Sequence, residues 1–285
     1  MSKSIKSTDL ILHQGAVYHL GIRPEDLASK IIAVGDPGRV ARISRYFDQI
    51  ETTAEHREFV THTGRYKGKR ITVISTGMGT DNIEILMTEL DALVNVDLET
   101  RTEKPEKQSL DIVRIGTSGS LRANIPVDTL LVSAMGIGLD TLMSFYPFPV
   151  TKEDKMLSDA LKEHASLPFS PYITYSDASL LNRIGEGMVR GITLTCPGFY
   201  APQGRSVRLQ PAQGDLLKQY ISFQHGQIQL TNFEMETAGY YSMGSLLGHR
   251  MLSVNVIVAN RVSDVFSTQA DQAMDEAIRL VLDRI

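Results

Sequence analysis

Two short segments of the chain combine glycine with arginine, which together suit a phosphate group. Gly35-Asp36-Pro37-Gly38-Arg39 follows one apolar run, and Arg114 lies inside another that ends in Gly116-Thr117-Ser118-Gly119. Glycine lets backbone N–H groups approach an anion, and a guanidinium group binds phosphate oxygens in pairs. Taken alone, the first segment is better explained as an ordinary turn with a solvent-facing arginine, and Arg114 is equally half of a buried ion pair.

A cluster late in the chain, Phe199–Arg205, carries groups that suit a planar heterocycle. A ring could stack on Phe199, while the amide of Gln203 and the guanidinium of Arg205 bind its edge. The structural alternative is a loop with an aromatic side chain tucked under it and polar groups left in solvent.

A second late cluster, Asn232–Thr237, holds two carboxylates, Glu234 and Glu236. We expect this segment to open a helix, where acidic residues in the first turn favour the helix dipole. Carboxylate oxygens can also accept hydrogen bonds from a vicinal diol such as ribose. Both interpretations stand on the residues alone.

Motifs of several other enzyme classes are missing from the sequence. There is no P-loop, and Gly77-Met78-Gly79 lacks the third glycine of a dinucleotide-binding fingerprint. His56 and His62 have no partners at metal-ligand spacing, and there is neither an HExxH nor a GxSxG motif. Cys196 ends an apolar run and is expected to be an inert core thiol.

Composition narrows the class of protein further. The 285 residues carry a formal net charge of −4 and are 42% hydrophobic. An acidic chain without a basic block argues against nucleic-acid binding, and the apolar content is enough for a folded core. One cysteine fits a reducing compartment, and no apolar run reaches the length of a membrane span. We therefore expect a cytoplasmic protein that binds neither nucleic acid nor membranes.

Apolar, β-branched runs alternate with segments of helical period along the chain. This alternation predicts a single α/β domain over residues 1–285, with a mixed, mostly parallel central sheet and helices on both faces. Such sheets bind ligands at the carboxyl ends of their strands, where the clusters above lie. Residues 97–109 are polar and charged and are predicted to be a surface insertion. The predicted strands are 31–35, 70–76, 111–116, 129–134, 192–196 and 251–259, and the predicted helices are 39–47, 83–94, 152–165, 178–188, 234–247 and 269–285.

Eight motifs in this order resemble the nucleoside phosphorylase-I family, and within it the uridine phosphorylases. They are Tyr18-His19-Leu20-Gly21, Gly35-Asp36-Pro37-Gly38-Arg39, His56-Arg57-Glu58-Phe59, Ser75-Thr76-Gly77-Met78-Gly79, Arg114-Ile115-Gly116-Thr117, Phe199-Tyr200-x-x-Gln203-x-Arg205, Asn232-Phe233-Glu234-Met235-Glu236 and Asn260-Arg261. The resemblance implies reversible phosphorolysis of uridine to uracil and ribose 1-phosphate, in pyrimidine nucleoside salvage or catabolism.

The resemblance also implies a role for each matching residue. Gly35, Arg39, Arg114 and Thr117 would hold phosphate, joined by Arg57 of a neighbouring subunit; Met235 and Glu236 would hold ribose, joined by the neighbour's His19; and Phe199, Gln203, Arg205 and Arg261 would hold the base. Of these, Arg114, Gln203, Arg205 and Glu236 would take part in catalysis. The borrowed residues imply a homodimer or a trimer of dimers. No organic cofactor is implied, and a monovalent cation such as K⁺ could bind near Glu58.

Alternatives of other kinds remain at this point. Asp264, three residues after Arg261, could protonate a purine, which would make the chain a purine nucleoside phosphorylase. A hydrolytic nucleosidase would have no use for the arginines, and a non-catalytic nucleoside-binding module would be expected to lack some of the site residues. Pro202, Gly204 and Thr80-Asp81-Asn82 depart from the commonest family pattern, which leaves the acceptance of deoxyuridine or thymidine open.

Overall fold

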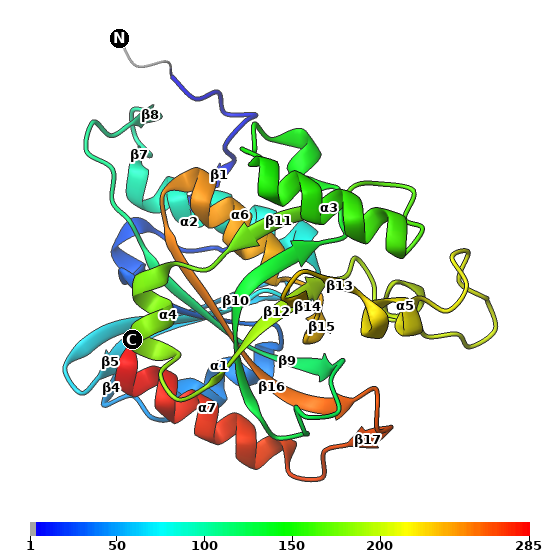
Figure 1. Cartoon of the computed structure of the whole chain (residues 1–285). Coiled ribbons are helices and arrows are strands. Elements are labelled where there is room, and N and C mark those ends of the chain that lie inside the picture. Colours follow the sequence, from blue (N-terminus) through cyan, green and yellow to red (C-terminus); the bar gives the residue numbers. More distant parts are fainter. Residues whose placement is uncertain (1–3) are drawn as a thin grey trace.

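The computed structural model describes residues 4–285, and a large mixed β-sheet flanked by helices forms its centre (Figure 1). The strands of this sheet are β3 (Lys30–Val34), β4 (Gln49–His56), β5 (Phe59–Tyr66), β6 (Lys69–Ser75), β9 (Asp111–Ser120), β10 (Leu130–Gly138), β11 (Tyr172–Tyr175), β12 (Val189–Thr195), β15 (Asn232–Glu234), β16 (Arg250–Asn260) and β17 (Val265–Phe266). The central pairs β6–β3, β3–β9 and β9–β16 are parallel, and the outer pairs β4–β5, β5–β6 and β16–β17 are antiparallel.

Five of these strands form a closed ring, because the last pairs with the first. β9 pairs with β16, β16 with β10, β10 with β12, β12 with β15, and β15 with β9 again. The remaining strands β3, β6, β5 and β4 extend from β9 as an open sheet. The closed part therefore has an enclosed side, and its strands carry most of the residues predicted for the site.

Helices cover both faces of the sheet because each presents an apolar stripe to it. Val40 and Ile43 of α1, together with Ile278 and Val281 of α7, pack in one hydrophobic cluster with β3, β9 and β16. Ile83 and other apolar residues of α2 pack with α6 on the opposite face. The helices are α1 (Pro37–Ser44), α2 (Thr80–Asn95), α3 (Lys152–His164), α4 (Ala178–Ile184), α5 (Leu216–Ser222), α6 (Thr237–Leu247) and α7 (Ala270–Arg284).

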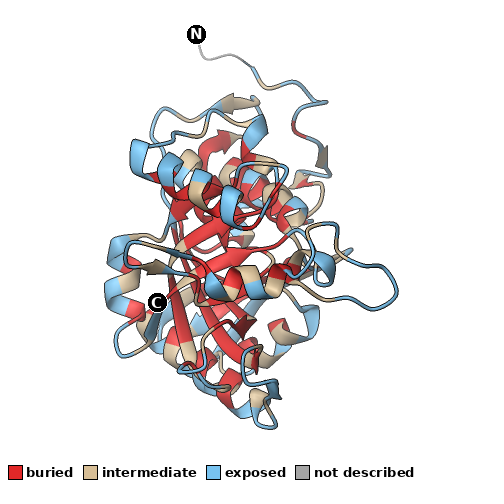
Figure 2. Ribbon diagram, turned by 45° about the vertical axis from the view of Figure 1, so that its right-hand side comes forward, coloured by how far each residue is buried: buried red, intermediate tan, exposed pale blue. Residues whose placement is uncertain are grey.

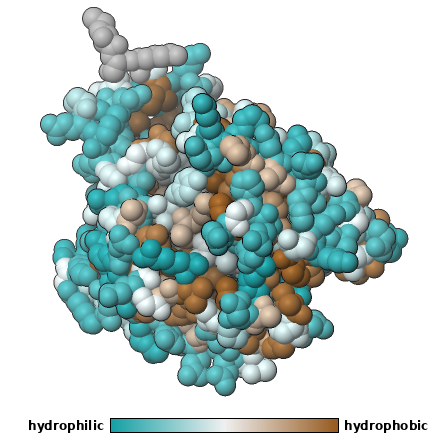
Figure 3. Space-filling model, viewed as in Figure 1, coloured by the Kyte–Doolittle hydropathy of each residue, from teal (hydrophilic) through white to brown (hydrophobic). Residues whose placement is uncertain are grey.

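Burial follows this layering. Buried residues fill the sheet and the inner helix faces, while the outer helix faces and loops are exposed (Figure 2). The view in Figure 3 is mostly hydrophilic, with hydrophobic residues in separate groups between. Among the described residues, no helix is long and apolar enough to cross a membrane.

The predicted fold class and its long elements are confirmed. Several boundaries were wrong: the predicted helix 39–47 ends at Ser44, and the predicted helix 178–188 ends at Ile184. The predicted helix 234–247 begins at Thr237, because Asn232–Glu234 forms strand β15 parallel to β12. This pairing joins residues almost forty positions apart, so it cannot be predicted from a local sequence pattern.

Residues 97–109 begin in a small hairpin of β7 (Val96–Asp97) and β8 (Thr102–Glu103). Its turn contacts the N-terminal segment, since the Arg101 carbonyl accepts from Ile5 N at 2.7 Å and Arg101 Nη1 donates to the Leu10 carbonyl at 2.8 Å. The other short elements are β1 (Leu12–His13), β2 (Ala16–Val17), β13 (Gln224–His225), β14 (Ile228–Gln229) and the 3-10 turns Pro24–Asp26, Leu142–Phe145 and Ala201–Gln203.

Candidate active site

A cavity of about 510 Å³ lies at the carboxyl ends of β3 and β9 and beside β15. It brings together residues from distant parts of the chain that were predicted for phosphate, ribose and base. Those that line it are Gly35, Arg39, Arg114, Thr117, Phe199, Gln203, Arg205, Met235 and Glu236. The arginines at positions 39 and 114 thus share one pocket, as a common anion site requires.

Arg114 is buried, and two carboxylates neutralise it. Its Nη2 lies 2.5 Å from Glu236 Oε2 and 3.2 Å from Glu234 Oε2. Burial by itself would lower the pKa of Arg114, but the two carboxylates outweigh burial and hold that pKa above its ordinary value. Arg114 is therefore a permanently charged group inside the sheet.

Gly116 makes room for this guanidinium group. A Cβ at position 116 would stand 2.1 Å from Arg114 Nη1 and 2.4 Å from Cζ. Residues 114 and 116 point to the same side of β9 because side chains alternate along a strand. Glycine at this position has a packing reason of its own, in addition to any backbone contact with a ligand.

The carboxylates that hold Arg114 are themselves fixed by hydrogen bonds. Glu236 Oε1 accepts from the backbone N–H of Gly79 at 3.0 Å. Glu234 Oε1 accepts from Thr195 Oγ1 at 2.7 Å, and its carboxylate also accepts from the backbone N–H of Thr237. Burial raises the pKa of Glu234, and Arg114 opposes that rise. Glu234 was not predicted as a site residue, although it belongs to the motif that was quoted.

Arg39 is the second cation of the cavity. Its Nη1 donates to the Ile115 carbonyl, a contact of 3.4 Å that ties the first turn to β9. Burial is the main cause that lowers the pKa of Arg39, and the nearby charge of Arg114 lowers it further. Arg39 and Arg114 therefore place two cations at one end of the cavity, and this arrangement is consistent with the predicted binding of an anion there.

The groups predicted for the base are already linked to one another. Arg205 lies over the ring of Phe199, with its Cζ 3.8 Å from the ring centroid, and its Nη1 donates to Gln203 Oε1 at 2.6 Å. Burial, with the neighbouring charge of Arg261, lowers the pKa of Arg205 to about 10. Gln203 is buried, so the bond from Arg205 sets how its amide is presented. An aromatic face, an amide and a cation therefore converge here.

Arg261 stands behind this group rather than in the cavity lining. Its Cζ lies 5.5 Å from the centroid of the Phe233 ring, and its Nη1 donates to the Gln203 carbonyl at 3.5 Å. Phe233, which lines the cavity, is a residue that the sequence did not mark as functional. Gly77, Met78 and Ser118 also line the cavity; they belong to quoted segments but had no predicted role of their own. Phe266 lines it too and belongs to no quoted segment.

His19 and Arg57, predicted to serve a neighbouring subunit, lie together outside this cavity. His19 Nδ1 is 2.6 Å from Glu89 Oε1, and the Arg57 Cζ is 5.7 Å from the centroid of the Tyr18 ring. Arg57 also has a φ of +55°, a left-handed conformation that costs energy for a residue with a side chain. Their roles toward a second copy stay predictions.

Glu58, the predicted neighbour of a monovalent cation, packs against Gly77 beside the amide of Asn82. Within residues 4–285 no group of three or more His, Cys, Asp or Glu residues could hold a metal ion. One carboxylate does not make a cation site, so K⁺ at Glu58 would need oxygen ligands from elsewhere.

Asp264, on which the purine alternative depended, lies in the turn between β16 and β17. It is exposed, has a φ of +53° and is not among the described residues that line the cavity. A proton donor for a purine ring must reach the base, and the position of this carboxylate outside the cavity lining does not favour that role.

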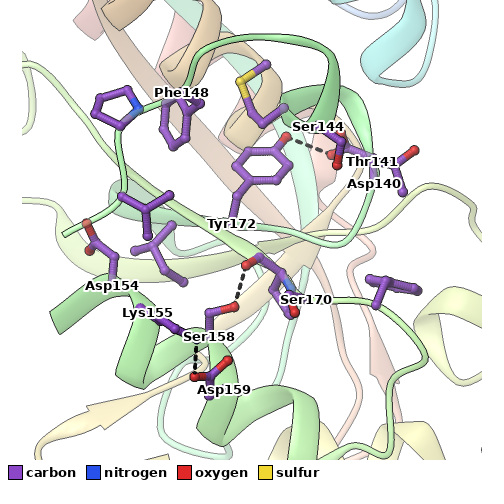
Figure 4. Close-up of a pocket in the computed structure, with 16 residues that line it drawn as sticks. Asp140, Thr141, Ser144, Phe148, Asp154, Lys155, Ser158, Asp159, Ser170 and Tyr172 are labelled. Carbon is purple, nitrogen blue, oxygen red and sulfur yellow. Dashed lines mark hydrogen bonds and ion pairs between the residues drawn. The ribbon is translucent and has the colours of Figure 1, made fainter. Parts of the chain in front are cut away.

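A second cavity, of about 480 Å³, lies between α3, β11 and the turn at Leu142–Phe145 (Figure 4). Its polar groups bond to one another: Tyr172 donates to Asp140 Oδ2 at 2.7 Å, and Lys155 Nζ lies 2.8 Å from Asp159 Oδ2. None of the predicted site residues line it.

Comparisons with known proteins agree with this geometry. The chain is 28% identical over 278 residues to the uridine phosphorylase of Thermococcus kodakarensis, which covers 94% of this chain and 87% of that protein. It is equally identical over 276 residues to the uridine phosphorylase of Escherichia coli, which covers 94% of this chain and 96% of that protein.

A solved structure extends the likeness to three dimensions. The crystal structure of a Trypanosoma brucei nucleoside phosphorylase, which shows uridine phosphorylase activity, is 30% identical and superposes with a TM-score of 0.87. The superposition covers 97% of this chain and 99% of that chain. The sequence pattern of the phosphorylase superfamily matches residues 30–285. This chain therefore belongs to the phosphorylase superfamily.

Proposed function

We propose that this protein is a uridine phosphorylase, a pentosyltransferase that catalyses the reversible phosphorolysis of uridine to uracil and ribose 1-phosphate. The observation that carries the proposal is one cavity lined by Arg39 and Arg114, by Gln203 and Arg205, and by Glu236. The named relatives in Thermococcus and Escherichia and the Trypanosoma structure support the same substrate.

Phosphate would be the nucleophile. Arg39 and Arg114 attract the dianion, and the backbone N–H of Gly35 and the hydroxyl of Thr117 complete its position beneath the sugar. Breaking the C–N bond gives the sugar positive charge, which the bound phosphate stabilises before it forms the new bond to C1′. Glu236 would accept hydrogen bonds from the ribose hydroxyls, with Met235 packed against the ring.

Uracil would leave with the electron pair of the broken bond. Its negative charge spreads to the carbonyl oxygens, where Gln203 and Arg205 can donate and Phe199 can stack. The hydrogen bond from Arg205 would strengthen most as this charge grows, because its cation is half-buried and its pKa is lowered. The mechanism needs no organic cofactor and no covalent intermediate with the enzyme.

We propose a homo-oligomer built from dimers in which His19 and Arg57 complete the cavity of the second copy. In support, both residues lie next to Tyr18, and neither is among the described residues that line the cavity of their own chain. A cytoplasmic location is proposed from the single, buried Cys196.

The test is an absorbance assay of uridine with the purified protein, with and without phosphate. Phosphate-dependent loss of uridine absorbance is expected, with inosine and 5′-methylthioadenosine turned over much more slowly. Uridine cleavage without phosphate would indicate a hydrolase, faster turnover of inosine a purine enzyme, and binding without cleavage a nucleoside-binding module.

A further inference from the structure

The five strands that close into a ring each contribute a buried polar side chain to one connected group on their enclosed side. Their neighbours in sequence, such as Val132, Val254 and Leu194, pack under the outer helices, so alternation along each strand turns the polar residues inward. The five side chains, all buried, are Ser118 on β9, Asn255 on β16, Ser133 on β10, Thr193 on β12 and Asn232 on β15.

Hydrogen bonds join these side chains into one chain that begins at Arg114 and ends at the cavity. The steps are Arg114 Nη1 to Asn255 Oδ1 at 2.9 Å, Asn255 Nδ2 to Ser133 Oγ at 3.1 Å, Ser133 Oγ to Thr193 Oγ1 at 2.6 Å, Thr193 Oγ1 to Asn232 Oδ1 at 2.9 Å, and Asn232 Nδ2 to Ser118 Oγ at 3.1 Å.

Chemistry fixes the direction of this chain. A guanidinium group only donates, so Asn255 must turn its oxygen to Arg114 and its N–H to Ser133. Thr193 Oγ1 donates its hydrogen bond to Asn232 Oδ1. Because each hydroxyl has only one hydrogen to donate, Ser133 Oγ is the donor in its hydrogen bond with Thr193 Oγ1. Asn232 then donates to Ser118, whose oxygen makes no other hydrogen bond within residues 4–285. The hydroxyl hydrogen of Ser118 remains for the cavity that Ser118 lines.

We propose that Asn255 is a positioning residue for the reaction. Its oxygen fixes Nη1 of Arg114, while Glu236 and Glu234 fix Nη2, so the guanidinium plane is held at both ends. Its amide also starts the chain that makes Ser118 a donor toward the substrate. Because Arg114 is proposed to bind phosphate, the role of Asn255 rests on the proposed function.

The first test replaces the amide by an apolar group of equal shape, Asn255→Leu. Without its acceptor, Nη1 keeps only Ser253 Oγ at 3.4 Å, and the guanidinium plane can turn. We expect kcat/KM for phosphate to fall by about 10- to 100-fold, and the Kd for phosphate measured by calorimetry to rise, while KM for uridine changes much less. Phosphate affinity within twofold of the wild type in a folded variant would overturn the proposal.

Asn95→Leu is the matched control. Asn95 is also a buried amide with several hydrogen bonds, to Asp91 and Gln108, but it ends α2 away from the cavity. Its loss should lower the melting temperature without changing the phosphate Kd. Phosphate binding is measured without nucleoside. If the wild type binds phosphate but does not turn over uridine, the proposed function is refuted, and the role of Asn255 in positioning Arg114 is not.

Asn255→Asp keeps the acceptor for Arg114 and tests the direction of the chain, should the leucine variant not fold. A protonated carboxyl group has the donor and acceptor of the amide, whereas a carboxylate cannot donate to Ser133. The charged groups around it are Arg114, Glu234 and Glu236, with the Tyr241 hydroxyl bonded to Ser133 and Ser253 nearby. The kcat/KM for phosphate, divided by the wild-type value at each pH, should fall as the pH rises. A constant ratio contradicts the directed chain.

Discussion

Arg114 Nη2 and Glu236 Oε2 lie 2.5 Å apart, so the residue proposed for phosphate is ion-paired with the residue proposed for ribose. Phosphate bound as proposed would compete with Glu236 for the same cation. The hold of Arg114 on Glu236 would then weaken, and the carboxylate would become a better acceptor for ribose hydroxyls. In the proposed function, the pair would thus couple the two substrates through one shared guanidinium group.

Glu236→Gln should separate these two effects. Removing one negative charge beside Arg114 is expected to tighten phosphate binding by at least about threefold, since the cation is less neutralised. Turnover of uridine should fall by about 100-fold, because the amide is a weaker acceptor for the ribose hydroxyls. Calorimetry with phosphate and steady-state kinetics give the two numbers. Weaker phosphate binding would show that Glu236 supports Arg114 rather than competing for it.

Gly116→Ala should act directly on Arg114. The new Cβ would stand 2.1 Å from Arg114 Nη1, so the guanidinium group must move, and we expect phosphate affinity to drop by about 10-fold or more. Gly244→Ala is the control, because its Cβ would meet Met251 Cγ at 2.2 Å outside the cavity. Both variants should lose stability, and only the first should lose phosphate binding. Equal phosphate Kd values in the two variants would contradict this placement of Arg114.

The sequence pointed to Arg114 because a charged residue inside an apolar strand needs a partner. It could not say which one, since Glu234 and Glu236 are more than a hundred residues away and reach Arg114 only through the pairing of β15 with β9. The pairing of β15 with β12 likewise moved the start of α6 from Glu234 to Thr237. Long helices such as α7 were predictable because an apolar stripe is local information.

Asn255 is a clearer case of a residue whose role could not be predicted from the sequence. A lone amide in the run Met251–Ala259 has no signature of function in sequence. Its proposed role depends on the ring that five strands form, because the pairing of β10 with β16 brings Ser133 beside Asn255. Motifs identified the residues that face the cavity, whereas residues that act through others depend on topology.

Arg205→Ala should reduce catalysis more than binding. Its Nη1 donates to Gln203 Oε1 at 2.6 Å, and its cation lines the part of the cavity proposed for the leaving base. We expect kcat to fall by about 100- to 1,000-fold, with a smaller change in KM for uridine. Arg208→Ala, an exposed arginine in the same loop, is the control and should be near wild type. Unchanged kcat in Arg205→Ala would refute activation of the leaving group by this residue.

Glu234→Gln should change how stability depends on pH. Burial raises the pKa of Glu234 in the folded protein, so the folded state binds a proton that the unfolded state has already released once the pH exceeds about 4.5. The wild type therefore loses stability from this group as the pH rises from the unfolded pKa through the folded one. The glutamine variant has no proton to release at this position. Its free energy of unfolding, minus that of the wild type, should therefore increase as the pH rises over that window, by about 1.4 kcal/mol per unit of pKa shift. Urea unfolding of both proteins across this range measures the difference, and a gap that shrinks as the pH rises would mean that Arg114 holds the pKa of Glu234 below its ordinary value instead.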